Sequence, residues 1–429
     1  MRFFYIIFLL FAPVYAWAYL DPGTGSLLLY AIIGVAASII FALRNLWYRI
    51  IEIFFARKSR HRVPNELPDI VFHSEGGHYW HVFQPVMKHC ATHFIECAYV
   101  TPDPKDPAFE WAKTHDSVSV IHVGTEMMTL AWMNRIKTRI VVSTTPNLDV
   151  YMWKRSPYVE RYVHLFHAPT TVEFYEKYAL CFYDDIIGCG KFQESGIREL
   201  DEKRKLPQKR FLIAGLTYYD YMIDELNSLQ LQAPSKTEKN PIVLYAPSWG
   251  IRSSLSTLGI ASIRELLAAD YRVIFRPHPQ SLISDKEILA EIYSSFSDNP
   301  LFKVDTKITG LVSMNESDLL ITDFSGMLFD YAFLFGKPII LAALEAPTGG
   351  YEAENLDGPL WDVETARILS REFPKKNSEL PKEVTQVIAT GNVNMKKIEE
   401  IRNHSIANYG NAGPAVANCI LSILGELAQ

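Results

Sequence analysis

Residues Asp318–Ala342 constrain the fold of this chain more than any other stretch, because they predict a strand, a polar turn, a helix and a second strand in succession. Leu319–Ile321 is apolar without alternation, which is typical of a strand buried on both faces of a parallel sheet. The helix is predicted to end at Gly336, since glycine there and Pro338 two residues later are a common helix stop. Such a unit is typical of an α/β fold.

The polar turn between this strand and this helix is a candidate phosphate site. It contains Asp323, Ser325 and Gly326. In an open α/β sheet, ligands bind beyond the carboxyl ends of the strands, where the free N–H groups and the dipole of the next helix favour a phosphate. The alternative is that Asp323 or Ser325 only caps a structural helix, since both residue types are common caps.

Length, charge and cysteine content restrict the class of protein. With 429 residues, the chain is too long for one ordinary core, and two or three domains are predicted. Its formal net charge of -6 gives no reason to expect a nucleic-acid partner. Five cysteines without a CxxC spacing favour reduced thiols in a reducing compartment over zinc ligands or disulfides.

Residues 1–62 form a predicted membrane segment. Ala16–Trp17–Ala18 has the small-x-small pattern of a signal-peptidase site, which is compatible with cleavage. Leu27–Leu43 contains no charge and is long enough to span a bilayer. Six Arg and Lys residues follow the span before position 63, and this bias predicts that the rest of the chain lies in the cytoplasm. The alternative is a buried helix of a soluble protein.

The remainder of the chain predicts two Rossmann-like, doubly wound α/β domains. Strand and helix patterns alternate over residues 69–226 and again from residue 240. Between them, residues 227–239 are rich in Gln, Ser and Lys and are typical of a linker. A mostly helical tail begins near Pro381 and is assigned to the second domain, which extends over residues 240–429. A cleft between two such domains is a natural ligand site.

Three polar turns are predicted to meet at one edge of the second sheet. Ser248–Trp249 follows one strand, Arg276–Pro277–His278–Pro279 follows the next, and the turn at Asp323 follows a later one. The two prolines hold His278 on a stiff loop, which suits a catalytic or phosphate-binding imidazole. The alternative is a surface turn with an incidental histidine.

The first domain offers two weaker candidates. Ser74–Glu75–Gly76–Gly77 follows the first strand and brings backbone within reach of a ligand, but it lacks the GxGxxG spacing. His167–Ala168–Pro169 ends another apolar run, and a lone histidine there is more often structural. No metal site is predicted, because six other histidines of this domain lack a metal-ligand spacing such as HExxH: His73, His78, His81, His89, His93 and His122.

The order and spacing of these pieces resemble the CDP-glycerol glycerophosphotransferase family, which builds teichoic-acid-type polymers. The resemblance rests on TDFSGMLFDYAFLFGKPII, on Arg276–Pro279, on Tyr245–Trp249 and on His167–Pro169, and it covers roughly residues 160–345. It implies the GT-B architecture of two facing Rossmann-like domains. It also implies transfer of glycerol phosphate, or a related polyol phosphate, from a CDP-alcohol to a hydroxyl acceptor with release of CMP.

The resemblance also implies roles for single residues. His167 and His278 occupy the positions of the family's two catalytic histidines, with His167 expected to be the base and His278 the group that stabilises the phosphates. Donor phosphates are expected at Arg276, Asp323, Ser325 and Gly326, the donor nucleotide at Ser248 and Trp249, and the acceptor at Ser74, Glu75, Gly76 and Gly77. No cofactor is implied, while a divalent cation is left open.

This chain departs from the family pattern at three positions. Ala168 replaces a glycine, Gly250 stands where an arginine commonly follows the tryptophan, and Gly326 replaces a second serine. The implied partners are CDP-glycerol or a similar CDP-alcohol, a hydroxyl acceptor linked to a membrane lipid, and the membrane itself. The N-terminal hydrophobic region is no part of the family pattern, so the expected location rests on the sequence alone: the inner, cytoplasmic membrane of a bacterial-type cell, with the catalytic domains in the cytoplasm.

Two other functions fit the same fold. One is a GT-B glycosyltransferase or nucleotide-sugar epimerase, which would use the same edge loops for a nucleotide-sugar. The other is an inactive, membrane-tethered nucleotide-binding protein, which the altered His167–Ala168–Pro169 turn keeps open. Release of CMP from CDP-glycerol separates the transferase from both.

Overall fold

The structure is a computed structural model that describes residues 66–428 except 230–239, 308, 343–345, 347 and 392–394. All described residues belong to one compact unit that begins at Ser59. The predicted cleavage site, the predicted span Leu27–Leu43 and most of the predicted linker lie outside the described residues. Among the described helices, none has the length and apolar character needed to cross a membrane.

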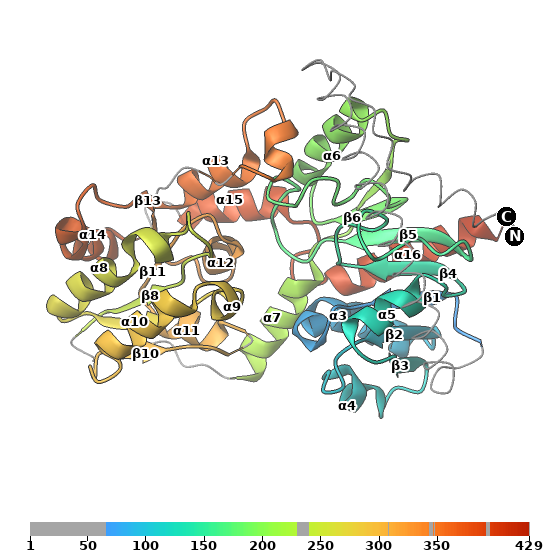
Figure 1. Cartoon of the computed structure of the whole chain (residues 1–429), viewed down its shortest axis with the longest axis horizontal. Helices are drawn as coiled ribbons and strands as arrows, with labels where there is room; N and C mark the ends of the chain where they lie inside the picture. The colour runs from blue at the N-terminus through green and yellow to red at the C-terminus, as the bar shows by residue number, and fades with distance from the viewer. Residues whose placement is uncertain are drawn as a thin grey trace, which may run out of the picture. The chain divides into compact units, whose positions relative to one another are not determined.

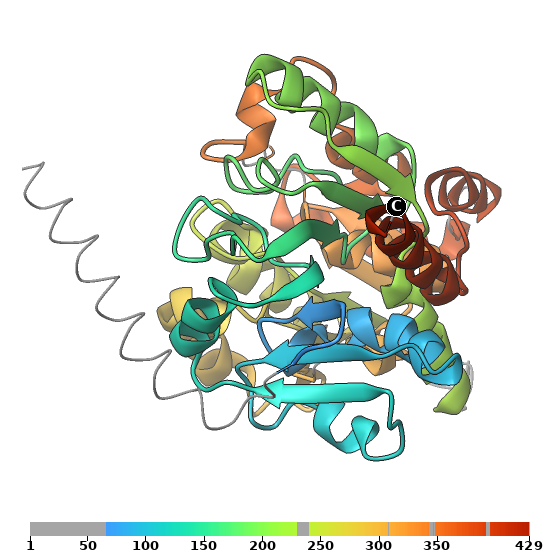
Figure 2. The ribbon, with the colours of Figure 1, turned by 90° about the vertical axis from the view of Figure 1, so that its right-hand side faces the viewer.

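The first sheet has seven parallel strands in the order β3-β2-β1-β4-β5-β6-β7 (Figures 1 and 2). Because β1 pairs with β2 on one side and with β4 on the other, the sheet is doubly wound, as predicted. The short edge strand β7 is half exposed and was not predicted, although its sequence contains the apolar run Phe211–Ile213. The strands are β1 (Ile70–His73), β2 (Cys97–Thr101), β3 (Val118–His122), β4 (Thr138–Ser143), β5 (Val159–Leu165), β6 (Asp185–Gly188) and β7 (Arg210–Ile213).

Helices cover both faces of this sheet, and neighbouring residues of a strand point into different cores. In β1, Phe72 packs with α3 and α16 on one face, whereas Val71 packs with α5 and α6 on the other. We call this sheet with its helices the first lobe. Its helical elements are η1 (Gly77–Tyr79), α3 (Trp80–Thr92), α4 (Ala108–Ala112), α5 (Glu126–Met133), α6 (Phe192–Lys203), α7 (Thr217–Ser228) and α16 (Ala412–Leu427).

The second sheet has six parallel strands in the order β10-β9-β8-β11-β12-β13. The strands are β8 (Ile242–Tyr245), β9 (Arg272–Phe275), β10 (Phe302–Val304), β11 (Leu319–Thr322), β12 (Ile339–Leu341) and β13 (Arg371–Glu372). Its helical elements are α8 (Ser254–Ala268), α9 (Ser281–Ser284), α10 (Lys286–Phe296), α11 (Leu311–Glu316), α12 (Gly326–Asp330), η2 (Tyr331–Phe335), η3 (Glu352–Asn355), α13 (Trp361–Leu369), η4 (Asn377–Glu379), α14 (Leu380–Thr390) and α15 (Met395–Ser405). We call this sheet with its helices the second lobe. The prediction of two parallel α/β sheets is confirmed.

The predicted strand, turn, helix and strand unit is present as β11, α12, η2 and β12. The helix is not uniform, because the five α-helical residues of α12 continue as a π-helical turn over Tyr331–Phe335. Gly336 ends this turn with φ 61°, a left-handed conformation that glycine adopts without strain. The predicted helix end is therefore confirmed, and its cause is the glycine conformation.

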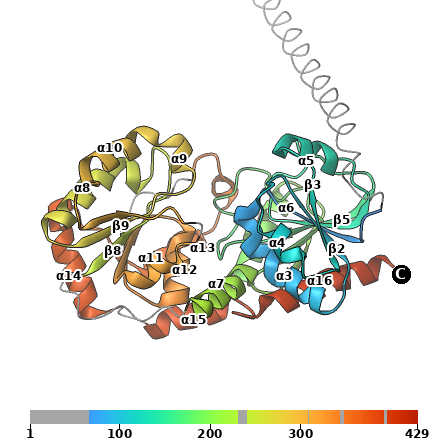
Figure 3. The same cartoon turned by 90° about the horizontal axis from the view of Figure 1, so that it is seen from below.

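Helix α16 differs from the predicted grouping, which places the whole helical tail in the domain of residues 240–429. It packs on α3 and α7 of the first lobe, as Figure 3 also shows for α3. Val416, Ile420 and Ile423 complete the core on one face of the first sheet. The apolar periodicity of a terminal helix shows that it is buried, but not which of two sheets it covers. The other predicted boundaries remain predictions.

A glycine lets α16 approach α3 closely. A Cβ atom added at Gly413 would lie 2.6 Å from the Pro85 carbonyl oxygen, whereas one added at Gly425 of the same helix would meet nothing within 4 Å. The Gly413 N–H also donates to Asp220 at 2.7 Å. The close packing of α16 on α3 therefore requires glycine at position 413.

We expect Gly413→Ala to lower the free energy of unfolding by about 1–3 kcal/mol, because the added methyl group overpacks the contact with Pro85. Gly425→Ala is the matched control and is expected to be neutral or to stabilise by about 0.5–1 kcal/mol, since alanine is the better helix former. Urea unfolding of both variants measures the difference. Equal stability of the two variants would contradict the packing of α16 on α3.

Candidate active site

The carboxyl ends of β8 and β11 form the switch point of the second sheet, and Asp323 joins the loops that leave them. One carboxylate oxygen of Asp323 accepts from the Ser248 N–H and the other from the Ser254 N–H, both at 2.8 Å. Asp323 is 3% exposed, so this carboxylate is held almost out of water. It positions the loop between β8 and α8 against the turn after β11.

The predicted turn after β11 presents open backbone. Ser325 is the N-cap of α12, and its hydroxyl accepts from the Met327 N–H at 3.3 Å. A Cβ atom added at Gly326 would meet nothing within 4 Å. The predicted capping role of Ser325 is therefore present, and the backbone at Gly326 is accessible to a ligand.

A cavity of about 890 Å³ lies between the two lobes. The predicted donor residues Ser248, Trp249 and Asp323 line it on the side of the second lobe. The first lobe contributes Tyr79, Pro146, Asn147, Phe174, Tyr175 and Glu176. This volume is in the range of small-molecule and nucleotide sites, and we call it the cleft.

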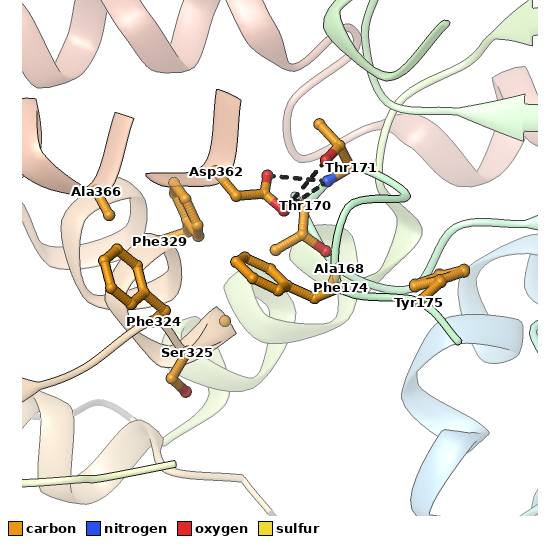
Figure 4. A pocket seen from close by; sticks show the side chains of 11 residues that line it. Ala168, Thr170, Thr171, Phe174, Tyr175, Phe324, Ser325, Phe329, Asp362 and Ala366 are labelled. Carbon is orange, nitrogen blue, oxygen red and sulfur yellow. Dashed lines mark hydrogen bonds between the residues drawn. The ribbon is translucent and has the colours of Figure 1, made fainter. Parts of the chain in front are cut away.

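A smaller cavity of about 220 Å³ lies between the turn after β5 and the turn after β11 (Figure 4). Ala168 of the turn after β5 lines it from the first lobe, and Ser325 and Gly326 line it from the second lobe. Phe174 and Phe324 line both this cavity and the cleft, so the two spaces adjoin. Most of the remaining wall is apolar or aromatic.

Buried carboxylates tie the lobes together behind this cavity. Asp362 at the start of α13 accepts from the Thr171 N–H at 2.9 Å and from the Thr171 hydroxyl at 3.2 Å, as the dashed lines in Figure 4 show. Glu173 accepts in return from the N–H groups of Trp361, at 2.6 Å, and Asp362. Burial raises the pKa of Asp362 well above its ordinary value, and Glu173 adds to the effect.

A strap formed by residues 351–357 also fastens the second lobe to the first. The Glu352 side chain forms an ion pair with Arg204 and accepts from the Tyr178 N–H at 2.7 Å. Its own N–H donates to the Tyr175 carbonyl oxygen at 2.9 Å. The loop that carries Phe174 and Tyr175 into the cleft is therefore held by the second lobe.

His167 stands directly behind the wall of the cleft. Its ring lies edge-on to Tyr79 at 5.4 Å and nearly parallel to Tyr175 at 6.5 Å, and both of these rings line the cleft. Burial lowers the pKa of His167 to about 4, with a smaller contribution from His78. The imidazole is therefore neutral at neutral pH.

His278 has a comparable place in the second lobe. Its Nδ1 accepts from the Gln280 N–H at 3.1 Å, which leaves the proton on Nε2. The ring lies 6.4 Å from Trp249, which lines the cleft. Burial lowers the pKa of His278 and Asp323 partly opposes the shift. The predicted loop geometry thus gives a neutral imidazole with a donor at Nε2.

Arg276 lies deeper than a phosphate ligand would require. Its guanidinium donates to Asp305 at 2.9 Å, and the Ser313 hydroxyl donates to the same carboxylate. The described walls of the two cavities do not include its side chain. The predicted contact of Arg276 with the donor phosphates remains a prediction.

The predicted acceptor loop after β1 is tightly held. The Ser74 hydroxyl donates to the Gly76 carbonyl oxygen at 2.9 Å. A Cβ atom added at Gly77 would lie 2.8 Å from the Pro107 ring, which explains why glycine is needed there. Burial raises the pKa of Glu75, and its side chain lines a separate cavity of the first lobe.

Arg252 is a cleft residue that was not predicted from the sequence. Its side chain is exposed and lines the cleft, and Nη1 would lie 3.5 Å from a Cβ atom added at Gly349. A signal was present, since Gly250 occupies the position where an arginine is expected and Arg252 follows two residues later. Gly250 has φ 87°, and this turn directs the chain so that Arg252 reaches the cleft wall.

The described residues show neither a metal cluster nor a disulfide. No group of three or more His, Cys, Asp or Glu side chains within residues 66–428, as far as they are described, is placed to hold a metal ion. All five cysteines carry free thiols.

The sequence of the second half matches a known family. Residues 200–408 match the model of the CDP-glycerol:poly(glycerophosphate) glycerophosphotransferase family. Over these residues the chain is similar to that family. The match confirms the expected resemblance and spans the positions of His278, Asp323 and Ser325, whereas His167 lies outside it; the roles of these residues remain predictions. A comparison with curated protein sequences finds no match.

Solved structures share the fold. The wall teichoic acid polymerase TagF, in a structure with CDPG, has a TM-score of 0.54 and 16% identity over 92% of this chain and 99% of that chain. The UDP-GlcNAc 2-epimerase of Neisseria meningitidis has a TM-score of 0.53 and 10% identity over 83% and 99%. That of Methanocaldococcus jannaschii has a TM-score of 0.51 and 13% identity, also over 83% and 99%. At these identities the likeness shows a common two-domain fold.

We expect Asp323→Asn to lower the free energy of unfolding by about 2–3 kcal/mol, because the amide keeps one acceptor and turns a donor toward a buried N–H. Hydrogen exchange at the Ser248 and Ser254 amides is expected to accelerate with it. Asp298→Asn, at an exposed position, is the control. Unchanged exchange at both amides would contradict the positioning role of Asp323.

Proposed function

We propose that this protein is a membrane-anchored transferase that moves glycerol phosphate, or a related polyol phosphate, from a CDP-alcohol to a hydroxyl acceptor. The reaction releases CMP and serves the synthesis of a cell-envelope polymer. The observation that carries the proposal is the family match over residues 200–408, which includes both turns at the switch point of the second sheet. The adjoining cleft supplies the space for a nucleotide donor.

The transfer replaces one bond to phosphorus by another. The acceptor hydroxyl oxygen attacks the phosphorus that carries the glycerol, the bond from this phosphorus to the bridging oxygen breaks, and CMP leaves with that oxygen. The hydroxyl proton must pass to a base. Such reactions depend on positioned acid–base groups and on stabilisation of the negative charge that spreads over the phosphate oxygens.

His167 is the proposed base. Burial lowers the pKa of His167 to about 4, which keeps the ring unprotonated but makes it a weak base while the cleft holds no anion. A bound diphosphate raises the pKa of a nearby imidazole, because it favours the charged form. Binding of the donor diphosphate is therefore expected to make His167 a stronger base. His167 lies outside the family match, and its role rests on its place behind Tyr79 and Tyr175.

His278 is the proposed donor to the phosphates. Its Nε2–H is available because Nδ1 is occupied by the Gln280 N–H. A neutral imidazole donates from Nε2 without being protonated, so a lowered pKa does not disable this role. The Gly326 amide is proposed to bind the same phosphates at the turn after β11, together with the Ser325 hydroxyl, since the Ser325 N–H already donates to the Asp323 carbonyl oxygen at 2.8 Å.

Two charged residues support this arrangement. Both carboxylate oxygens of Asp323 accept from loop amides, so we propose that Asp323 positions the turn rather than contacting the phosphates. Arg252 lines the cleft and brings a guanidinium to the donor, the kind of group that pairs with phosphate. It supplies the charge that the family pattern places two residues earlier.

The membrane anchor is proposed from the sequence. Leu27–Leu43 has the length and composition of a span, and the basic residues after it favour a cytoplasmic location for the lobes. The free thiols agree with a reducing compartment. We propose the cytoplasmic membrane of a bacterial-type cell as the location and a lipid-linked hydroxyl compound as the acceptor.

We expect His278→Ala and His167→Ala each to lower the rate of CMP release from CDP-glycerol by about 10²- to 10⁴-fold, since each removes one acid–base or hydrogen-bonding group. His404→Ala, at an exposed position of α15, is the matched control and is expected to retain the rate. The amount of CMP released is measured for each of the three variants. A parallel reaction with UDP-GlcNAc in place of CDP-glycerol tests for release of UDP.

Circular dichroism and urea unfolding establish that these variants are folded. A wild-type rate in His278→Ala would remove the assignment of that residue. Release of UDP from UDP-GlcNAc without release of CMP from CDP-glycerol would favour a nucleotide-sugar enzyme instead.

We expect the full chain to sediment with membranes and to resist extraction by carbonate, because an uncharged span of this length is stable only in a bilayer. Removal of residues 1–62 is expected to release it into the supernatant. Replacement of Val35 and Ala36 by arginine is the matched test in the full chain. Membrane association that survives both changes would contradict the predicted span.

A further inference from the structure

The helix that begins at the turn after β11 changes its geometry one turn later, at Asp330. Asp330 is the last residue of α12, and the π-helical turn of η2 begins at Tyr331. Such turns are rare, and they are frequent at functional sites. The proposed mechanism uses only the start of α12 and assigns no role to Asp330.

The Asp330 side chain contacts the first lobe. Its Oδ2 accepts from the Tyr218 hydroxyl of α7 at 3.1 Å. Burial raises the pKa of Tyr218 well above its ordinary value, so the phenol keeps its proton and is the donor. The Tyr218 ring lies edge-on to His81 of α3 at 4.9 Å, and the Thr217 hydroxyl donates to the Val82 carbonyl oxygen at 2.6 Å. The bond therefore joins α12 to two packed helices of the first lobe.

Two polar atoms beside this bond have no partner. Asp330 is 8% exposed, and within the described part of the chain its Oδ1 forms no hydrogen bond. The hydroxyl of Tyr219, the next residue of α7, is buried and equally unpaired among the described residues. Tyr219 is near enough to affect the pKa of Asp330. A buried carboxylate oxygen without a donor is costly, and so is a buried hydroxyl without a partner.

One proton satisfies both atoms. A proton on Oδ1 lets the neutral acid donate to the Tyr219 oxygen, while Oδ2 still accepts from Tyr218. Burial raises the pKa of Asp330 to about 7, and nearby groups lower it in part. The titratable and charged side chains that face Asp330 are Tyr218 and Tyr219 of α7, Arg276 after β9 and Tyr409 before α16, with Arg402 of α15 stacked on Tyr409.

We propose that Asp330 is a positioning residue that holds α12 against α7 of the first lobe through Tyr218 and Tyr219. It does so as a neutral acid. The described walls of the cleft and of the smaller cavity do not include Asp330, so it acts through α12 and does not contact the substrate.

The effect of Asp330 on catalysis rests on the proposed transferase function. The proposed phosphate contact at Gly326 begins α12 in the second lobe, whereas the proposed base, His167, follows β5 in the first lobe. A fixed contact between α12 and α7 keeps the phosphorus atom within reach of the base. Phosphoryl transfer depends largely on positioning of this kind.

The contact is expected to weaken as the pH rises. When the lobes separate, the carboxyl group is hydrated and its pKa returns to the ordinary 3.8, whereas in the contact the pKa is about 7. The contact therefore binds the proton more tightly than the separated state does. Its stability is complete below the ordinary pKa and is lost as the pH rises to about 7.

Infrared difference spectroscopy tests the protonation of Asp330 without any substrate. The C=O band of protonated carboxyl groups is compared between the full chain in detergent, Asp330→Asn, and Asp298→Asn as the exposed control. We expect part of this band to be absent from Asp330→Asn alone at about pH 6, and the same part to decline in the wild type by about pH 8. Identical bands in all three proteins would overturn the neutral acid.

Hydrogen exchange tests the contact between the lobes. Tyr218→Phe removes only the hydroxyl, and Tyr221→Phe on the same helix is the matched control. The amides of Thr171 and Glu352 form bonds that cross between the lobes, so we expect their exchange to accelerate about fivefold in Tyr218→Phe. The Ser254 amide, bound within the second lobe, is the internal reference. Equal exchange in the two variants would overturn the positioning role.

Rates separate positioning from a structural role. In Tyr218→Phe we expect kcat for CMP release to fall about tenfold, while the Kd of CDP stays within about twofold, because the proposed phosphate contacts belong to the second lobe. Asp330→Asn is the conservative replacement and is expected to retain most of kcat, since its amide both accepts and donates. Weaker CDP binding in Tyr218→Phe, or an equal loss of kcat in Asp330→Asn, would contradict the inference.

The three experiments also separate this inference from the transferase proposal. If the wild type releases no CMP, the proposed function fails, and the infrared and exchange results still decide the role of Asp330. If the wild type releases CMP but Tyr218→Phe has wild-type exchange and kcat, the inference fails and the transferase remains.

Discussion

The site of the second lobe depends on one buried carboxylate. Asp323 follows β11 directly, and its two oxygens hold the N–H groups of Ser248 and Ser254 at 2.8 Å. Without these bonds the loop after β8 would have no fixed relation to the turn after β11, since the helices that follow the two strands, α8 and α12, pack on opposite faces of the sheet. Asp323 thus fixes the positions of Trp249, Arg252 and the Gly326 backbone relative to one another. The side chain can stay buried there because each of its oxygens accepts a hydrogen bond.

The two lobes are connected by the same kind of interaction. Asp362 and Glu173 exchange hydrogen bonds across the lobes, and the strap through Glu352 fixes the loop of Phe174 and Tyr175. Those two aromatic residues line both spaces between the lobes. The shape of the cleft is therefore a product of polar contacts made behind it, and apolar packing alone does not determine it.

Features that depend on neighbouring residues were predicted from the sequence, whereas features that depend on contacts between distant residues were not. The strand, the Asp323 turn and the stop at Gly336 follow from neighbouring residues, so sequence reasoning found them. The lobe on which α16 packs could not be predicted from neighbouring residues, because periodicity shows that a helix face is buried but not which element covers it. Arg252 was missed for a related reason: the positive φ of Gly250 redirects the loop, and only the backbone shows where the next side chains point.

The groups at the switch point of the second sheet suit the proposed donor. The second lobe offers backbone N–H groups at Gly326 and a guanidinium at Arg252, which favour a diphosphate. A cavity of about 290 Å³ at the carboxyl ends of β1 and β4 is lined by Glu75 and Glu126 instead. Pro146 and Asn147 line both this cavity and the cleft, so the switch points of the two sheets open toward a common boundary.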